Sequence, residues 1–486
     1  MNREIPGFYY DSAKRKYFKI EDNKTAPEGA SWSRGAVKRR ALEKSEEEER
    51  KRKESRFGEG VRRARLSIGD FTGVGVSDSR RREEDLPLKV WASGLREKGQ
   101  KTLWDVSFLS DEGVSDEGVM EGMWVGPQED DEGADGVCFA SWSESAWMFC
   151  KGVFRDGDDR ITERDTSIRN WGFDIERLGA IVSIKFHTFS QTSIVTGSSR
   201  VIVKQPDDNS RLSGGDPYYP GLSYEIPNAE VHCCEISKLS NPNNVDAIFG
   251  STRGLFYYQN YGIHELVPVT RSTLKKIPFH QRPPFWGDIL SVDYLKQQDH
   301  NIILAGTRSG HICLIDRRTS PKEWESNIFR HKSSVAHVKS LLNSPHEVLA
   351  AGPSSAMAIY DIRFLRRQKQ AEQNHHCPWN QTTLPIVNFP EYRNEAHIKT
   401  GLDILTDPGY GCGLVATAHD DCTIGVYSLR DGSRLPAGDV DKIKAQAVIR
   451  SLMWQKLPGD IHPSLFVGLG PRIKKYSFSG EIIEKF

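Results

Sequence analysis

The chain has 486 residues, of which 37% are hydrophobic and 10% aromatic, so it is long enough to bury a large core. Its 66 Lys and Arg residues balance 66 Asp and Glu residues, which excludes a net electrostatic field for holding nucleic acid or an anionic membrane. No apolar run approaches the roughly 20 residues of a membrane helix, and the N-terminus lacks an apolar signal-peptide core. We expect a protein of the nucleus or cytoplasm with no membrane partner, and we do not expect direct binding of nucleic acid.

Residues 1–90 form a polar, charged extension. Within it, "KRRALEKSEEEERKRKESRF" places Glu46 to Glu49 each four residues before a basic residue, Arg50 to Lys53. Each such pair adds about 0.2–0.5 kcal/mol to an isolated helix, so a helix is predicted from about 36 to 56. Its few apolar residues leave two interpretations, a solvated helix or a segment that docks on an adaptor.

Three basic stretches also lie in this extension, at Lys38 to Arg40, Arg50 to Lys53 and Arg62 to Arg65. They fit nuclear import signals, a local nucleic-acid patch or simply a solvated tail. Further along, residues 111–135 read "DEGVSDEGVMEGMWVGPQEDDEGAD", with ten acidic residues, no Lys or Arg and many Gly. That composition predicts a disordered acidic loop between strands.

From about residue 137 the chain contains a repeat. Each unit has an alternating apolar strand, a turn rich in Gly, Ser, Asp or Arg, and a second alternating strand. Six units are visible, with neighbouring starts 46 to 65 residues apart, and further strands such as "AIVSIKF" and "DILSVDYL" precede them. The units begin at Ile194, Ala247, Ile303, Leu349, Leu414 and Leu465.

Three or four strands in each period resemble the blades of a WD-repeat β-propeller, whose repeats are about 40–45 residues long. We therefore predict an all-β propeller over residues 91–486. Seven blades are expected, with the seventh in "GVCFASWSESAWMFC" around Phe139 and Trp147. The alternative is eight blades, with "KTLWDVSFL" as a further strand. Pairing of the C-terminal strand near 465–478 with an early strand would close the ring and hide its open edges.

Neither catalysis nor metal binding is indicated. The sequence has no GxSxG, HExxH, P-loop or dinucleotide fingerprint, so we predict no enzyme, no catalytic residues and no cofactor. "NHHCPWN" contains His375, His376 and Cys377 but no fourth ligand at metal spacing, so no metal site is expected. The eight cysteines lack CxxC spacing, which favours reduced thiols.

A charged pair recurs where two of the predicted strands end. "SGHICLIDRRT" ends in Asp316 with Arg318 two residues later, and "SAMAIYDIRFLRR" ends in Asp361 with Arg363 two residues later. Residues i and i+2 of a strand lie on one side, so each pair should emerge together, at equivalent positions of adjacent blades. The Asp is expected to accept backbone N–H groups at the turn, which leaves the two Arg forks available to a carboxylate-rich or carbonyl-rich partner. A third strand end, "VYSLRDG", has Arg430 in register but Ser428 in place of the Asp.

Paired Asp-x-Arg motifs that end consecutive blades resemble the signature of the WD-repeat substrate receptors of cullin-4 ubiquitin ligases. The usual form is Trp-Asp-x-Arg, and here Ile315 and Tyr360 take the aromatic position. The N-terminal "IPGFYYDSAKRKYFKI" (5–20) is in addition similar to the Pro-Gly-aromatic-Tyr-Asp…Arg-Tyr-Phe segment of the factor-four subfamily of these receptors. The alternative interpretation of this segment is a short hairpin whose aromatic residues pack on the propeller.

The resemblance implies a substrate-recognition subunit that docks on the damaged-DNA-binding-protein adaptor and, through it, on cullin-4. The adaptor-binding residues would be Asp316, Arg318, Asp361 and Arg363, and the target would be a protein that the sequence does not identify. The alternative is a nuclear WD-repeat scaffold in chromatin or RNA processing that has no link to the ligase. Whether Arg318 and Arg363 carry binding distinguishes the two.

Overall fold

The computed structural model divides the chain into two compact units, Met1–Arg80 and Arg81–Phe486. The second unit starts ahead of the expected boundary at residue 91, since it includes the helix α3 (Leu86–Ser93), whose Trp91 and Ala92 are buried in its core. The structure describes residues 8–11, 16–20, 37, 86–103, 119–127, 136–142, 148–156, 160–162, 180–190, 192–204, 222–240, 245–267, 282–295, 301–342, 344–365, 383–406, 413–460 and 462–478.

In the first unit, the described residues form the hairpin that the aromatic segment allowed. Strands β1 (Phe8–Asp11) and β2 (Lys16–Lys19) are antiparallel, with Tyr9 opposite Phe18. Phe8 and Tyr17 are 45% and 39% exposed. Except for Val37, the expected helix over 36–56 lies outside the described residues, and so do the three basic stretches.

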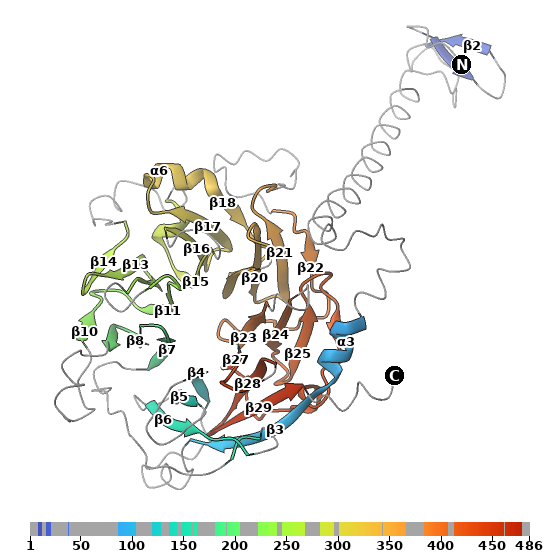
Figure 1. Ribbon diagram of the computed structural model, residues 1–486. Coiled ribbons are helices and arrows are strands. Elements are labelled where there is room, and N and C mark those ends of the chain that lie inside the picture. Colours follow the sequence, from blue (N-terminus) through green and yellow to red (C-terminus); the bar gives the residue numbers. More distant parts are fainter. Residues whose placement is uncertain are drawn as a thin grey trace, which may run out of the picture. The chain divides into compact units, whose positions relative to one another are not determined.

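The second unit is a ring of antiparallel sheets (Figure 1). Five of them take four strands consecutively from the sequence, and each is called a blade. Blade 1 consists of β7 (Ile181–His187), β8 (Thr192–Gly197), β9 (Arg200–Lys204) and β10 (Leu222–Glu225). Blade 2 consists of β11 (Val231–Ile236), β12 (Ala247–Ser251), β13 (Gly254–Gln259) and β14 (Gly262–Glu265). Blade 3 consists of β15 (Ile289–Tyr294), β16 (Ile302–Thr307), β17 (His311–Asp316) and β18 (Ile328–Arg330).

Blades 4 and 5 continue the same order, but each has an outermost strand of only two residues. Blade 4 consists of β19 (His337–Ser340), β20 (Glu347–Gly352), β21 (Ala356–Asp361) and β22 (Val387–Asn388). Blade 5 consists of β23 (Leu402–Leu405), β24 (Leu414–Ala418), β25 (Ile424–Ser428) and β26 (Arg434–Leu435). The short helical turns between strands are η3 (Pro284–Trp286), α6 (Pro321–Trp324), η4 (Glu325–Asn327) and η6 (Val440–Lys442).

Blade 6 closes the ring by combining both ends of the propeller sequence. It contains β27 (Leu452–Gln455), β28 (Ser464–Leu469), β29 (Arg472–Phe478) and, as its outer strand, β3 (Leu95–Thr102). Arg472 lies opposite Thr102, and Phe478 lies opposite Leu95. The predicted closure by an early strand is confirmed. Lys101 and Thr102, the first two residues of "KTLWDVSFL", belong to β3 and therefore to the fourth strand of this blade, while the segment from residue 104 onward lies outside the described residues.

The expected number of seven blades is wrong, because the described residues form six blades of four strands each. Between β27 and β7 the ring contains a three-stranded sheet of β4 (Met120–Gly126), β5 (Gly136–Trp142) and β6 (Met148–Val153). Beyond β6, the described residues add one isolated antiparallel bridge, between Arg155 and Ile161. The aromatic segment that predicted a seventh blade therefore forms two strands of a sheet that has three strands within the described residues.

Strand β4 also corrects the expectation of a disordered loop over 111–135. The apolar residues Met120, Trp124 and Val125 are at most 7% exposed, and they pack against the neighbouring sheets. Burial of these three side chains favours a strand despite the acidic composition on either side. Residues 111–118 and 128–135 lie outside the described residues.

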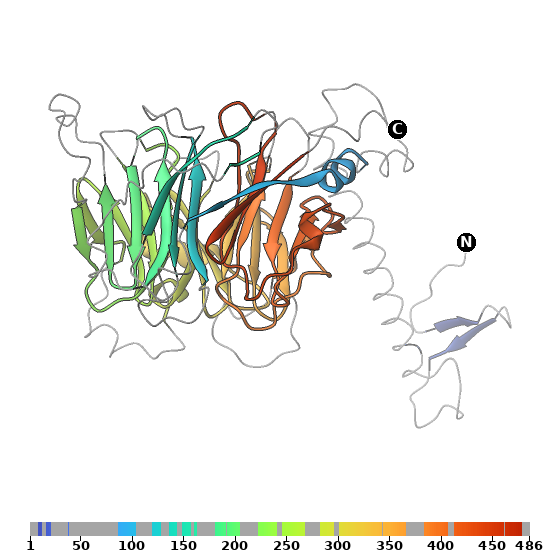
Figure 2. The ribbon, with the colours of Figure 1, turned by 90° about the horizontal axis from the view of Figure 1, so that it is seen from below.

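All six predicted repeat units are confirmed as the second and third strands of the six blades. These strands alternate between two buried faces, so apolar residues such as Ile303, Ala305, Cys313 and Ile315 are fully buried. The turn between β16 and β17 needs a left-handed residue, which Gly310 supplies with φ of 85°. In the side view the strands of neighbouring blades stand next to each other, and their connecting loops form two opposite faces (Figure 2).

Candidate protein-interaction surface

The two Asp-x-Arg motifs lie at equivalent positions. Asp316 is the last residue of β17 and Asp361 is the last residue of β21, which are the third strands of the adjacent blades 3 and 4. This placement follows the prediction made from their 45-residue spacing. We call the face on which the first and third strands end the Asp-x-Arg face.

Arg318 and Asp316 form a bidentate pair. The Arg318 Nε donates to Asp316 Oδ1 at 2.8 Å, and its Nη2 donates to Oδ2 at 2.7 Å. The backbone N–H of Arg318 donates to Oδ1 at 3.0 Å, which closes the turn after the strand. Hydrogen bonds from the Arg318 side chain lower the pKa of the Asp316 carboxyl below its ordinary value.

Blade 4 repeats this geometry. Arg363 Nε donates to Asp361 Oδ1 at 3.1 Å, Nη2 donates to Oδ2 at 2.8 Å, and the backbone N–H donates to Oδ1 at 2.9 Å. The guanidinium carbon of Arg363 also lies 5.4 Å from the centre of the Phe364 ring. The Arg318 and Arg363 side chains are 54% and 49% exposed, so both pairs are accessible to a partner.

These pairs correct one expectation. The Asp residues do accept the turn N–H groups as predicted, but each Arg fork is engaged by its own Asp and is not open. The turn brings residues i and i+2 close enough for two parallel N–H···O bonds, the geometry that a guanidinium and a carboxylate prefer. The surface therefore presents two identical ion pairs, each with its Arg side chain held in place.

The third motif keeps the turn with a hydroxyl in place of the carboxylate. On blade 5 the backbone N–H of Arg430 donates to Ser428 Oγ at 3.2 Å, the same bond that an Asp oxygen accepts on blades 3 and 4. A hydroxyl can replace a carboxylate as the turn acceptor, but it carries no charge for the guanidinium. The three strand ends thus share one hydrogen bond, from the backbone N–H of the Arg to the side-chain oxygen two residues earlier, and differ in whether that oxygen belongs to a carboxylate or a hydroxyl.

A buried link next to this surface was missed at the sequence level. Arg317, which lies between the two motif residues on blade 3, places Nη1 2.5 Å from Oδ2 of Asp246 on blade 2. The Tyr294 hydroxyl donates to Asp246 Oδ1 at 2.9 Å, and the Arg317 guanidinium lies 4.8 Å from the Tyr257 ring centre. Burial and the neighbouring Asp246 raise the pKa of Tyr294 well above its ordinary value. The sequence could not predict this ion pair, because Asp246 lies 71 residues before Arg317 and no local pattern relates the two.

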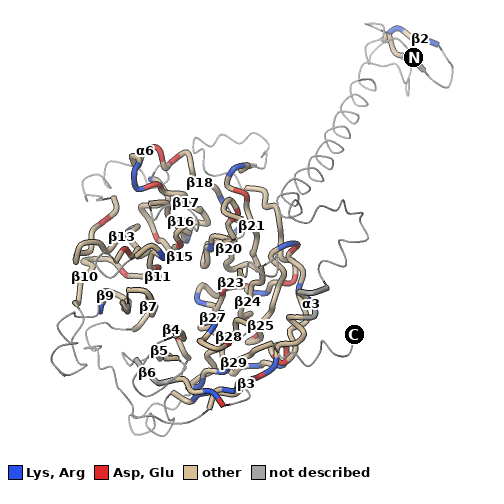
Figure 3. The backbone as a smooth tube through the Cα atoms, in the orientation of Figure 1, with Lys and Arg blue, Asp and Glu red and all other residues tan. Residues whose placement is uncertain are grey.

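Charged residues of both signs lie where the chain leaves β17 and enters α6 (Figure 3). The hydroxyl of Tyr360, which takes the aromatic position of the blade 4 motif, lies 2.8 Å from Nδ1 of His331 in the buried interior. Burial lowers the pKa of His331 to about 4, so the ring is neutral at pH 7. The hydrogen bond ties the third strand of blade 4 to the segment that leads into that blade.

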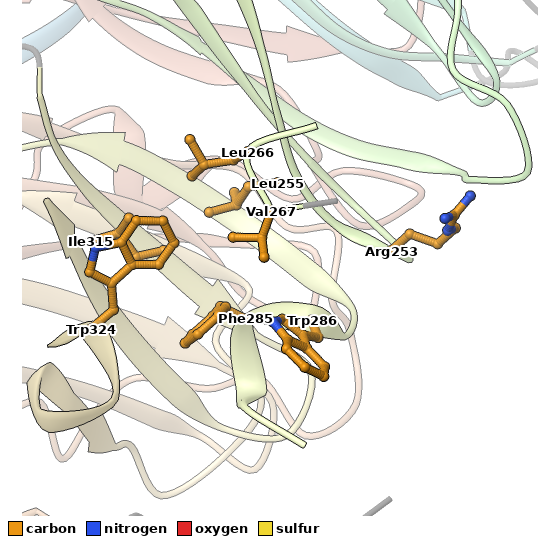
Figure 4. A pocket seen from close by; sticks show the side chains of 8 residues that line it. All are labelled: Arg253, Leu255, Leu266, Val267, Phe285, Trp286, Ile315 and Trp324. Carbon is orange, nitrogen blue, oxygen red and sulfur yellow. The ribbon is translucent and has the colours of Figure 1, made fainter. Parts of the chain in front are cut away.

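One pocket of the described residues has little room for a small ligand. A pocket between blades 2 and 3 is lined mainly by apolar side chains, among them Phe285, Trp286 and Trp324 (Figure 4). Its free volume of about 10 Å³ is comparable to the space that a single water needs. In the part of the chain that the structure covers, no three His, Cys, Asp or Glu residues are grouped as metal ligands, and no helix is long and apolar enough to cross a membrane. The segment with His375, His376 and Cys377 is outside that part.

No family model matches the sequence. The chain is similar to WD repeat-containing protein 21 of Schizosaccharomyces pombe (strain 972 / ATCC 24843), with 34% identity over 86 residues. This stretch is 18% of the chain and spans 19% of the length of that relative. The ring of four-stranded blades and the local similarity together support a WD-repeat β-propeller, an architecture that generally serves as a scaffold for protein interactions and not for catalysis.

Proposed function

We propose that this protein is a substrate-recognition subunit of a cullin-4 RING ubiquitin ligase. It would dock on the damaged-DNA-binding-protein adaptor through Asp316, Arg318, Asp361 and Arg363 and present a protein target for ubiquitination. The observation that carries the proposal is the pair of identical, accessible Asp–Arg forks at equivalent positions of adjacent blades. The resemblance of these motifs to those of the receptor family supplies the identity of the partner.

The Arg318 and Arg363 side chains are fixed by their Asp partners, which favours docking of the adaptor. A free Arg side chain loses about 0.5–1.5 kcal/mol of conformational entropy when a partner fixes it. Arg318 and Arg363 are already fixed by two side-chain hydrogen bonds each, so part of that cost is met before binding. A carbonyl or carboxylate of the adaptor would then meet a rigid donor surface on two neighbouring blades.

The test is binding of the purified adaptor by the Arg318→Ala, Arg363→Ala double variant. Exposed ion pairs contribute only about 0–1 kcal/mol to stability, so the double variant should fold normally. We expect its adaptor affinity to fall at least tenfold. A matched control is Arg393→Ala, because Arg393 is 66% exposed and pairs with Asp421 on the opposite face. Unchanged adaptor binding by the folded double variant would refute the proposal and favour a nuclear scaffold without a link to the ligase.

A further variant separates the role of the Asp from that of the Arg. Asp361→Ala removes the acceptor of the Arg363 backbone N–H as well as the partner of its side chain. The Asp361 side chain is 12% exposed, so its loss should lower the free energy of unfolding by about 1–2 kcal/mol, in addition to weakening adaptor binding. Chemical denaturation of Asp361→Ala and Arg363→Ala side by side measures this difference.

A further inference from the structure

Exposed apolar side chains of the propeller lie on a single face. Among the described residues of the second unit, the large hydrophobic side chains that remain exposed all follow a first or third strand, or precede or begin a fourth strand. They are Phe189 (73% exposed), Leu222 (52%), Leu239 (64%), Tyr261 (61%), Phe364 (67%), Leu384 (48%) and Ile386 (37%).

Topology places all of these on the Asp-x-Arg face. Within an antiparallel blade, the first and third strands end on one face and the second and fourth strands begin there. The first strands of blades 3 and 4 run in the same direction. Near the start of β15, the Ser291 hydroxyl donates to the backbone carbonyl of Val335, which precedes β19. Near the end of β15, Asp293 accepts the backbone N–H of Ser340, the last residue of β19. Burial lowers the pKa of His187 and the backbone of Lys238 partly offsets this effect, which places the turn that carries Leu239 close to the turn that carries Phe189.

The opposite face has a different character. There the turns between second and third strands, and the loops that lead into first strands, expose charged side chains. Arg393 is 66% exposed, Lys399 53%, Arg308 48% and Asp421 42%. Single exposed hydrophobic residues are ordinary on any protein, but their restriction to one face marks that face for contact with another protein.

On the Asp-x-Arg face, exposed apolar residues adjoin cations on blades 2 and 4, and blade 3 between them adds a further cation. Leu239 on blade 2 follows the exposed Lys238, Arg318 projects from blade 3, and Phe364 on blade 4 follows Arg363. Phe189 extends the series to blade 1. We call this set, Phe189, Lys238, Leu239, Arg318, Arg363 and Phe364, the docking arc.

We propose that the docking arc binds an acidic, amphipathic segment of the adaptor, with Leu239 and Phe364 as its apolar anchors and the adjoining cations as partners of carboxylates. This inference rests on the proposed function and names the chemistry of the same contact. The combination of cations and apolar side chains on the arc is complementary to a segment that combines Asp or Glu with Leu, Phe or Met. Aromatic and aliphatic anchors that become fully buried supply most of the affinity of such interfaces, while charges at their rim set the rate and the salt dependence of association.

The first experiment measures the affinity of the full chain for the purified adaptor by biolayer interferometry. We expect Leu239→Ser and Phe364→Ser each to raise Kd about tenfold, and the double variant to raise it at least about a hundredfold. Leu222→Ser is the matched control, because Leu222 is the same residue type on the same face, is 52% exposed and lies outside the arc. All three side chains are exposed, so the melting temperatures should equal that of the wild type.

The second experiment identifies the bound segment by carbodiimide cross-linking, which joins a Lys amine directly to a carboxylate in contact with it. We expect Lys238 to couple to an Asp or Glu of the adaptor that is flanked by apolar residues. Lys238→Arg should abolish this cross-link while preserving affinity, because Arg keeps the charge but does not couple.

The outcomes separate this inference from the proposed function. If the wild-type chain does not bind the adaptor, both fail. If it binds, and the double-arginine variant loses binding while Leu239→Ser and Phe364→Ser bind normally, the proposed function stands and the docking arc is refuted. Coupling of Lys238 to a second copy of this chain, with a dimer mass in light scattering, would likewise overturn the adaptor as the occupant of the arc.

Discussion

The buried ion cluster in blade 6 yields the sharpest stability prediction. Lys475 of β29 places Nζ 3.0 Å from Oδ1 of Asp460, and Arg155, just after β6, places Nη1 2.6 Å from the same oxygen. The Lys475 and Asp460 side chains are 0% and 1% exposed. Asp460 also accepts the backbone N–H of Leu457 at 3.1 Å. One carboxylate therefore joins the closing blade to the three-stranded sheet beside it.

Asp460→Ala leaves two cations without this carboxylate in a site with little access to water. Removing one member of a buried, hydrogen-bonded ion pair costs about 3–5 kcal/mol, mostly because the remaining charge is still buried. We expect a decrease of that size in the free energy of unfolding, measured by urea denaturation with tryptophan fluorescence and linear extrapolation. Asp460→Asn keeps the side-chain shape and one acceptor oxygen, so its decrease should be smaller.

Glu97→Ala is the matched control. It removes the ion pair between Glu97 of β3 and Lys474 of β29, which also joins two strands of blade 6, at 3.0 Å. These side chains are 39% and 26% exposed, so the expected loss is only about 0–1 kcal/mol. If Asp460→Ala destabilises the protein no more than Glu97→Ala does, burial does not control the strength of this cluster and the reasoning is refuted.

Three further predictions concern closure, pH and the extension. A chain that ends at Gly470 lacks β29 and leaves β3 unpaired, so we expect an insoluble product; a monomer that melts cooperatively near the full-length temperature would contradict the closure. Burial lowers the pKa of His331 from 6.5 in the unfolded chain to about 4 in the folded protein, so the free energy of unfolding should decrease by about 3 kcal/mol as the pH drops from 6.5 to 4. Urea denaturation at several pH values should show that the free energy of unfolding of His331→Gln depends less steeply on pH over this range. Deleting residues 36–56 should weaken adaptor binding and leave the melting temperature of the propeller unchanged, and a large loss of thermal stability would instead assign the segment to the fold.

The sequence by itself was sufficient to determine the class of fold and the repeat. Alternation with a period of two is a local property, so the hairpins from Ile194 to Leu465 could be read directly and all proved to be second and third strands. The 45-residue spacing of Asp316 and Asp361 likewise placed both motifs on equivalent strand ends.

Only the tertiary structure decided which strands complete each blade. Outer strands such as β22 and β26 have two residues each, too few to show alternation, and β3 joins blade 6 from the other end of the propeller sequence. The acidic residues on either side of Met120–Gly126 led to the prediction of a disordered loop, because composition is an average over many residues. The strand forms because individual side chains within it are buried.

The surface depended on tertiary structure for the same reason. Sequence spacing brought Arg318 near Asp316, but the turn geometry determined that the fork closes on its own carboxylate. The pairing of Arg317 with Asp246, and the gathering of Phe189, Leu239 and Phe364 on one face, join residues from different blades. These arrangements arise from the packing of neighbouring blades, which brings together residues that no local sequence pattern relates.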